Sequence, residues 1–203
     1  ENGFTDEADF GLPVSHKATA PTLWGAAGAT PLTNEKAWAK IVRQDALARP
    51  TLATTSEAVL DVLAKSEQYR VAFWQRDEAF SPTLSLEQVN QVRAANGLPP
   101  LNIYDGEVPN AAGTGSQRVL AENLFILTTD TVGETQWGTT AEALELVGSN
   151  AVDFSAKDAP GLTVVQYRTP DPVAVWTKVS SVVMPVAGDI NGVFIGTVRA
   201  GAN

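Results

Sequence analysis

The chain has 203 residues, of which 44% are hydrophobic, enough to build the core of one large domain or of two lobes. Its net charge of −9 argues against nucleic acid as a partner, and the absence of cysteine excludes disulfides and thiolate metal sites. No apolar run approaches the ~18 residues that span a membrane, so we expect no membrane partner.

Residues 1–32 are rich in glycine, proline and alanine, which predicts irregular structure. Within them, Phe10, Leu12 and Val14 alternate and predict one short strand. Residues 25–30 form a small-residue turn that lacks the Gly-Lys-Ser/Thr ending of a phosphate-binding loop. We therefore do not expect nucleotide binding there.

Apolar residues recur at helical spacing from residue 33 to residue 95, interrupted by one predicted strand at residues 51–54. Thr33, Ser56 and Ser66 each precede such a stripe and are predicted helix N-caps. Further along, Ser85 and Gln88 have the spacing of a capping box, and Asn96-Gly97 predicts the end of that helix.

Strand character returns after these helices. Residues 101–105 predict one strand, and residues 119–128 are expected to be its hairpin partner across a glycine-containing loop. Thr139 or Thr140 can cap a short helix over residues 141–147. The order of elements predicts a mixed α+β fold, with the helices clustered before a β-rich end.

Residues 161–200 are the most β-prone part of the chain, dense in valine and other branched or aromatic residues. Three runs stand out, at residues 162–167, 173–184 and 193–198, and the middle run alternates over its whole length. Asn191-Gly192 is a turn signal that predicts an antiparallel connection. We expect these strands to supply one sheet shared by two lobes, a framework without catalytic groups.

Few residues are candidates for chemistry. His16, the only histidine, lies beside Lys17 with no second histidine at ligand spacing, and we predict a solvated loop residue. The acidic cluster of Asp6, Glu7 and Asp9 lacks the ligand ladder and glycine of a calcium loop, so a solvated turn is expected.

Two further carboxylate pairs are candidates for acid–base chemistry. Asp77-Glu78 is expected to stay solvated. Asp130 and Glu134, on either side of Gly133, could serve an α+β enzyme, but nothing in the sequence places a substrate between them, and a loop role is expected. We predict no catalytic residue, no cofactor site and no metal site.

Five tryptophans stand at positions 24, 38, 74, 137 and 176. A carbohydrate-binding module would need several of these rings exposed along one groove, and base stacking would need basic neighbours. The tryptophans are scattered over different elements without basic clusters. Packing in the core and at interfaces is therefore their expected use.

Two stretches carry a family resemblance. Residues 123–146 combine a hydrophobic strand, a Val-Gly-Glu turn, Trp-Gly-Thr-Thr and an Ala-Glu-Ala-Leu helix start. Residues 161–185 lead from a strand through Asp171-Pro172 to Trp176-Thr177-Lys178 and an alternating strand. In number and order these features resemble the C-terminal two-thirds of tailed-bacteriophage major capsid proteins, the major capsid protein E family, over about residues 10–198.

The resemblance implies a Hong Kong 97-like α+β capsid fold with two domains. Residues 1–32 and 150–203 would form the peripheral (P) domain, and residues 33–149 the axial (A) domain. No counterpart of the family's N-terminal arm, extended loop and spine helix is recognisable upstream of Phe10, so we expect the fold to lack them. The loop at residues 74–83 would lie near a capsomer axis, and the turn at residues 168–172 near an inter-capsomer corner.

The function implied is structural rather than enzymatic: a subunit of a phage or prophage icosahedral capsid that self-assembles into hexamers and pentamers around packaged DNA. An encapsulin-like compartment shell is the alternative with the same fold. The implied partners are copies of the chain itself. The resemblance also allows scaffold or decoration proteins as partners, and it implies no specific binding of nucleic acid. The implied location is the virion capsid, and the host cytoplasm during assembly. Alone, the 203-residue chain is expected to be a monomer or weak oligomer, because the long-reaching contact segments were not recognised.

Overall fold

The computed structural model describes residues 10–74, 83–110, 114–146, 154–159, 161–170 and 173–201. The chain divides into two compact units. Unit 1 consists of Glu1–Val132 and Asp189–Asn203, and unit 2 is the inserted segment Gly133–Gly188. Both units contain helix and strand, in agreement with the predicted mixed α+β class.

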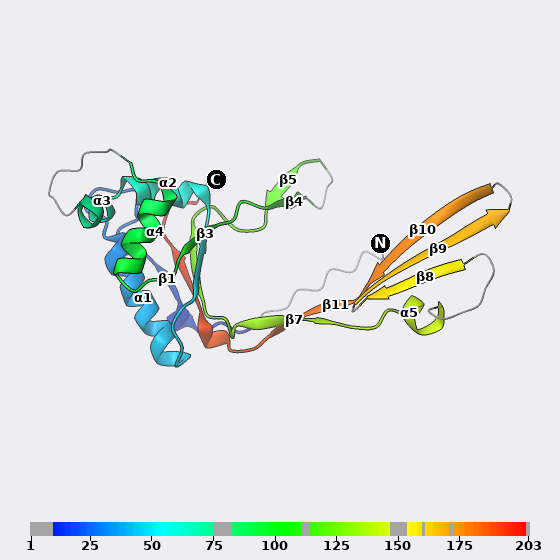
Figure 1. The fold of residues 1–203 in the computed structure, drawn as a ribbon. Coiled ribbons are helices and arrows are strands. Elements are labelled where there is room, and N and C mark those ends of the chain that lie inside the picture. The colour runs from blue at the N-terminus through cyan, green and yellow to red at the C-terminus, as the bar shows by residue number, and fades with distance from the viewer. Residues whose placement is uncertain are drawn as a thin grey trace. The chain divides into compact units, whose positions relative to one another are not determined.

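A five-stranded mixed sheet forms the centre of unit 1 (Figure 1). The outer pairs β1–β12 and β2–β3 are parallel, whereas β6 is antiparallel to both β12 and β2. The two ends of the described chain are therefore neighbours in one sheet. Across the sheet the strands are β1 (Lys17–Thr19), β12 (Val193–Thr197), β6 (Leu124–Thr128), β2 (Leu52–Thr55) and β3 (Leu101–Ile103).

The described residues of unit 1 form four α-helices: α1 (Pro31–Asp45), α2 (Glu57–Lys65), α3 (Glu67–Trp74) and α4 (Leu86–Ala95). The prediction that Thr33 caps the first helix is wrong, because α1 begins at Pro31 with Thr30 as its N-cap. Proline is favoured at this first position, since its φ is already helical and it has no N–H to satisfy there. Thr33 lies inside the first turn.

The other helix boundaries follow the local signals. The Ser56 hydroxyl accepts the N–H of Val59, which confirms the predicted cap of α2. Ser85 and Gln88 form both hydrogen bonds of the predicted capping box. Gly97 ends α4 with φ at +70°, a left-handed conformation that glycine adopts without steric cost.

An aromatic cluster fills the core of unit 1. Trp38 stacks on Trp24 and on Phe194, with ring centroids 5.8 Å and 5.2 Å apart, and Phe125 contacts Trp24 edge-on at 5.2 Å. All four rings are buried. Gly196 of β12 lies against the Trp38 ring so closely that a Cβ there would come within 2.6 Å of it. Two of the five tryptophans thus serve core packing, as predicted.

The described residues of unit 2 form two antiparallel sheets and one helix. The three-stranded sheet has β9 (Leu162–Pro170) between β8 (Phe154–Ala159) and β10 (Val173–Ser181), and β7 (Gly133–Trp137) pairs with β11 (Val183–Ala187). Helix α5 (Ala141–Leu146) is capped by Thr140, whose Oγ1 accepts the N–H of Ala143. That hydroxyl also lies 2.5 Å from the Thr163 hydroxyl of β9, which ties α5 to the sheet.

The predicted hairpin of residues 101–105 with residues 119–128 is wrong, because β2 lies between β3 and β6. The hairpin in this region is instead β4 (Glu107–Pro109) with β5 (Ser116–Arg118). The predicted strand at residues 10–14 is also displaced. Residues 10–13 are irregular, Val14–His16 form a 3-10 turn (η1), and the strand is β1.

Residues 161–200 do not form one shared sheet, and that prediction is wrong. The middle run stops at Ser181, and after Val182 the chain enters β11, so the stretch contributes to three different sheets. Asn191-Gly192 belongs to a second 3-10 turn, η2 (Ile190–Gly192), capped by Asp189, rather than to a hairpin. The strands on either side, β11 and β12, pair with β7 and β6.

The boundaries of the two units differ from those of the predicted domains. Residues 193–197 and 124–128, which the prediction placed in the P and A domains respectively, are paired strands of one sheet in unit 1. The names peripheral and axial refer to positions in a shell, so the assignment itself stays a prediction.

Candidate assembly surfaces

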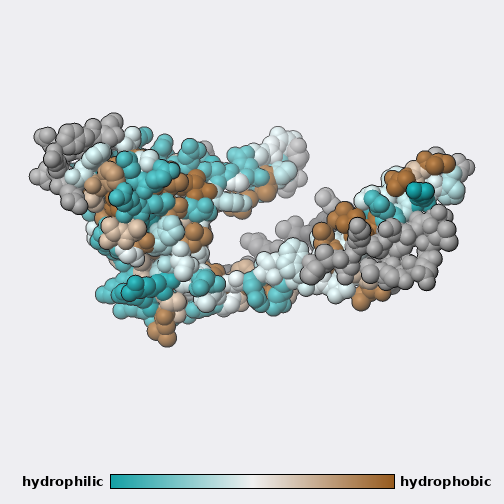
Figure 2. Space-filling model, viewed as in Figure 1, coloured by the Kyte–Doolittle hydropathy of each residue, from teal (hydrophilic) through white to brown (hydrophobic). Residues whose placement is uncertain are grey.

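Apolar side chains are exposed on both faces of strand β10. Val173, Val175 and Val179 share one face and are 90%, 62% and 59% exposed, and Trp176 on the other face is 55% exposed. Figure 2 shows brown apolar patches on the strands of unit 2. Such a concentration on one strand is typical of a surface that contacts another protein.

Exposed apolar side chains also lie on other strands of unit 2. Tyr167 of β9, 41% exposed, lies directly opposite Trp176, and Trp137 of β7, 56% exposed, lies opposite Val183. Gly161 lies so close to the Trp137 ring that a Cβ would come within 2.3 Å of it, which fixes the position of that ring. We call this set of residues on β7, β9, β10 and β11 the apolar surface of unit 2.

Among the described residues, β10 is an edge strand of its sheet. Among the described strands it pairs only with β9, along all nine of its residues. A long, valine-rich edge strand is a template for addition of a strand from another chain. The edge and the apolar surface together suit unit 2 to protein–protein contact.

Among the described residues, two buried groups with raised pKa values, Glu35 and Tyr69, lie inside unit 1 beside Arg93. Glu35, Tyr69 and Arg93 are fully buried; the Tyr69 hydroxyl donates to Glu35 at 2.6 Å, and the Arg93 guanidinium pairs with the same carboxylate. Burial raises the pKa of Glu35 despite the opposing charge of Arg93, and burial together with the Glu35 charge raises the pKa of Tyr69. A substrate cannot reach groups without exposed surface, so this cluster holds α1, α3 and α4 together.

The prediction that His16 is a solvated loop residue is wrong. Its ring is fully buried, with Nδ1 2.7 Å from the Val193 carbonyl oxygen and Nε2 2.9 Å from an Asp45 carboxylate oxygen. His16 therefore links η1 to β12 and α1. Sequence spacing did not reveal this role, because the partners lie 177 and 29 positions away.

The other predicted acidic candidates do not form a described site. Asp130 lies in a turn of unit 1, as predicted. The predicted loop role of Glu134 is wrong, because Glu134 lies in strand β7 of unit 2, opposite Val186 of β11. Within the described part of the chain, no three or more His, Cys, Asp or Glu residues gather as metal ligands. No helix in that part is long and apolar enough to cross a bilayer. Five acidic residues and the centre of the predicted axis loop lie outside the described residues: Asp6, Glu7, Asp9, Asp77, Glu78 and residues 75–82.

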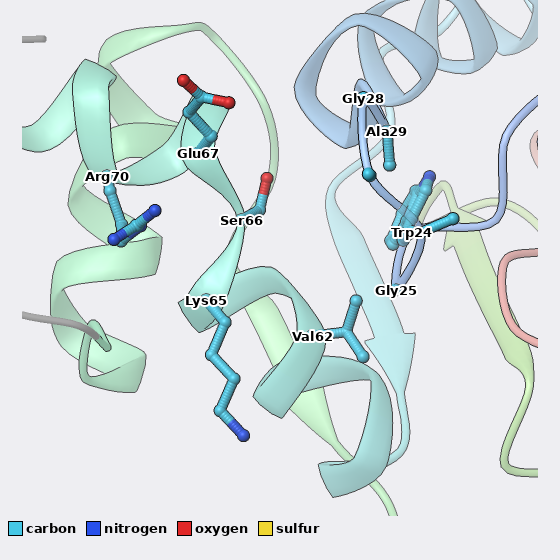
Figure 3. Close-up of a pocket in the computed structure, with 11 residues that line it drawn as sticks. Trp24, Gly25, Gly28, Ala29, Val62, Lys65, Ser66, Glu67 and Arg70 are labelled. Carbon is cyan, nitrogen blue, oxygen red and sulfur yellow. The ribbon is translucent and has the colours of Figure 1, made fainter.

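A hollow of about 330 Å³ lies between residues 24–29 and the junction of α2 and α3 (Figure 3). Lys65, Glu67 and Arg70 line one side, and Trp24 with the small residues of the loop lines the other. Among the described residues that line it, Ser66 has the only hydroxyl, and none is a histidine. The lining therefore lacks the nucleophile–base pair of a hydrolytic site.

Two solved structures have a similar fold. A phage-related protein of Bordetella bronchiseptica RB50 matches with a TM-score of 0.62 and 10% identity, over 91% of this chain and 57% of that chain. A prophage protein of Escherichia coli CFT073, provisionally assigned as a capsid protein, matches with a TM-score of 0.59 and 15% identity, over 93% of this chain and 54% of that chain. The chain thus spans little more than half the length of either protein. None of the curated proteins matches it.

The fold therefore defines a class, that of mixed α+β proteins similar to phage capsid proteins. The family described as phage major capsid protein E matches residues 1–198 of the sequence. The chain belongs to this family, which confirms the resemblance found in residues 123–146 and 161–185. The family consists of structural proteins rather than enzymes, and membership implies a place in the virion capsid.

Proposed function

We propose that the chain is a structural subunit of a phage or prophage icosahedral shell of the Hong Kong 97 type, self-assembling into hexamers and pentamers around packaged DNA in the host cytoplasm. The observation that carries this proposal is family membership over residues 1–198. Unit 1, which holds most of residues 33–149, would be the axial domain, and unit 2 the core of the peripheral domain.

The apolar surface of unit 2 supports this role energetically. Burying an exposed valine side chain contributes about 1.5–3 kcal/mol, so covering Val173, Val175 and Val179, which share one face of β10, contributes roughly 4.5–9 kcal/mol. Association itself costs an estimated 4–15 kcal/mol, so one such contact gives only weak pairing. Weak pairwise contact suits a shell, where each subunit is held by several neighbours at once.

The net charge suits a shell that encloses DNA. At −9 the chain repels phosphate backbones over distances set by the ionic strength, so a packaged genome would not adhere to the subunits. Scaffold or decoration proteins are additional partners in this proposal.

The test introduces charge into the apolar surface. The Val175→Asp/Val179→Asp variant and the matched control Gln91→Asp, at an exposed position of α4, are each produced in the natural gene context. We expect the first to abolish particles seen by electron microscopy and the second to leave them intact, with unchanged circular dichroism in both. Normal particles from the first variant would contradict the assigned surface.

The content of purified particles separates the proposal from the encapsulin-like alternative. Nuclease-protected DNA of uniform length inside the particles is expected of a phage or prophage capsid. Particles filled with a cellular protein cargo and no DNA would instead identify a compartment shell.

A further inference from the structure

Four cations gather at one end of the central sheet of unit 1. Lys36, Lys40 and Arg43 lie on α1 and Arg49 precedes β2; together with residues 96–98, which precede β3, they line a hollow of about 280 Å³. Strands β2 and β3 are parallel, so the segments that precede them meet at the same end of the sheet. We call this feature the basic hollow.

The charge of the basic hollow is not neutralised within the described structure. All four cations are exposed, and none forms an ion pair with a described residue. The two carboxylates of α1 are engaged elsewhere, Glu35 with buried Arg93 and Asp45 with His16. None of the described residues that line the hollow carries a carboxylate.

The dipole of α1 does not account for this arrangement. Cations stabilise the C-terminal turn of a helix, but the effect fades within that turn. Arg43 lies in the last turn, whereas Lys36 and Lys40 lie in the middle of the helix. Three like charges at i, i+4 and i+7 on one face repel one another by a few tenths of a kcal/mol per pair. The repulsion would be relieved by an anionic partner.

The opposite end of the same strands is acidic. Glu57 and Asp61 follow β2 on exposed positions of α2, and Asp105 follows β3, where its carboxylate accepts the N–H of Glu57 at 3.1 Å. Arg118 pairs with Asp105 and, at 3.3 Å, with Glu122. Only Asp105 and Glu122 pair with this guanidinium, and Glu57 and Asp61 form no ion pair with a described residue.

We propose that the basic hollow binds the acidic end of unit 1 of a second copy of the chain, in a head-to-tail contact. This inference rests on the proposed shell function and adds the partner surfaces to it. A contact between two different patches generates rings when the rotation closes, as a hexamer or pentamer requires. Complementary charge fixes the register of such a contact and opposes the repulsion between subunits of net charge −9.

Phosphate-bearing polymers are the other class of anion that a basic hollow can attract. Here the second copy is favoured, because the chain as a whole repels a phosphate backbone while each copy carries a carboxylate cluster that faces solvent at Glu57 and Asp61. Binding to duplex DNA is therefore an outcome of the test that would overturn the proposal.

The absence of native cysteine makes disulfide trapping a clean test, since any cross-link reports introduced thiols. A Lys40→Cys chain is mixed with an Asp61→Cys chain under mild oxidation, and disulfide dimers are followed by non-reducing electrophoresis. The matched control replaces Lys40→Cys with Lys17→Cys, which also removes an exposed lysine but lies on β1, at the other edge of the sheet. Circular dichroism checks that all three variants are folded.

We expect the Lys40→Cys/Asp61→Cys pair to cross-link at least about tenfold faster than the control pair, the lower end of electrostatic rate enhancement, and high salt to remove most of the difference. Equal rates for the two pairs would overturn the proposal. A second result would also overturn the proposal: fluorescence anisotropy showing that a labelled DNA duplex binds the wild-type chain at physiological salt, and that the Lys40→Cys substitution abolishes this DNA binding. If particles form normally but the cross-link does not, the head-to-tail contact is rejected and the shell function is not. If the cross-link forms but the chain gives no particles in any context, the shell function is rejected.

Discussion

The buried pair of Glu35 and Arg93 allows a quantitative prediction about stability. Glu35→Gln leaves the Arg93 guanidinium fully buried without a carboxylate, and arginine cannot lose its proton to escape the penalty. Breaking one side of a buried ion pair costs about 3–5 kcal/mol. For a chain of this size each kcal/mol lowers the melting temperature by about 2–4 °C, so we expect a fall of roughly 6–20 °C.

The reverse substitution should behave differently. Arg93→Met leaves Glu35, which can take up a proton, and burial already favours its protonated form by raising its pKa. A raised pKa means that the folded state binds more protons than the unfolded state in the window between the two pKa values. This contribution to stability is fully present below the unfolded pKa and is lost as pH rises through the folded pKa. The destabilisation by Arg93→Met should therefore grow from acidic to neutral pH, while that of Glu35→Gln should not.

Urea unfolding followed by circular dichroism at pH 4.5 and pH 8 measures both effects. The double variant Glu35→Leu/Arg93→Met removes both charges. Its loss of unfolding free energy should be about 1–3 kcal/mol smaller than the sum of the losses in the Glu35→Leu and Arg93→Met single variants, because the two residues are coupled in one network. Strict additivity of the singles within about 0.5 kcal/mol would show that the two side chains are not coupled. A pH-independent loss in Arg93→Met would refute the assignment of Glu35 as the proton-binding group.

Three local predictions use the same unfolding assay. Gly196→Ala would place a Cβ 2.6 Å from the Trp38 ring and should lower the free energy of unfolding by about 1–3 kcal/mol. The control Gly25→Ala, whose Cβ would meet nothing closer than 3.9 Å, should be nearly neutral. Equal effects of the two substitutions would contradict the packing of β12 against Trp38. Gly97→Ala should cost about 1–2 kcal/mol through its left-handed backbone alone, because no atom lies within 4 Å of the added Cβ. Ser85→Ala removes the capping box of α4 and should cost about 0.5–2 kcal/mol, and an unchanged unfolding midpoint would mean that the cap is formed but contributes nothing.

Much of the secondary structure was predictable because its causes are local. Ser56 and Ser85 cap their helices through N–H groups three residues away, and Gly97 ends α4 through its own φ. The start of α1 was misplaced for an equally local reason: the preference of Pro31 for the first helical position outweighs the capping tendency of Thr33. The family, too, was visible in the order of short motifs along residues 123–185.

The pairing of strands was not predictable in the same way. The alternation in residues 173–184 predicts a strand, but the pattern does not show that the strand ends at Ser181 or which neighbours it pairs with. Residues 101–105 and 119–128 looked like a hairpin because they are close in sequence, yet β2 separates them in the sheet. Period-two patterning specifies a face of a strand, not its partner.

The surfaces that bear on function were decided by tertiary structure. Composition and motifs determined an acidic structural protein of the capsid family. They did not show whether the valines of β10 are exposed, because a buried strand would have the same sequence pattern. The basic hollow joins α1 with residues 49–50 and 96–98, and His16 is buried against a carbonyl 177 positions away. Such contacts form only when the folding of the whole unit offsets the entropy of closing long loops, and no short window of sequence carries that information.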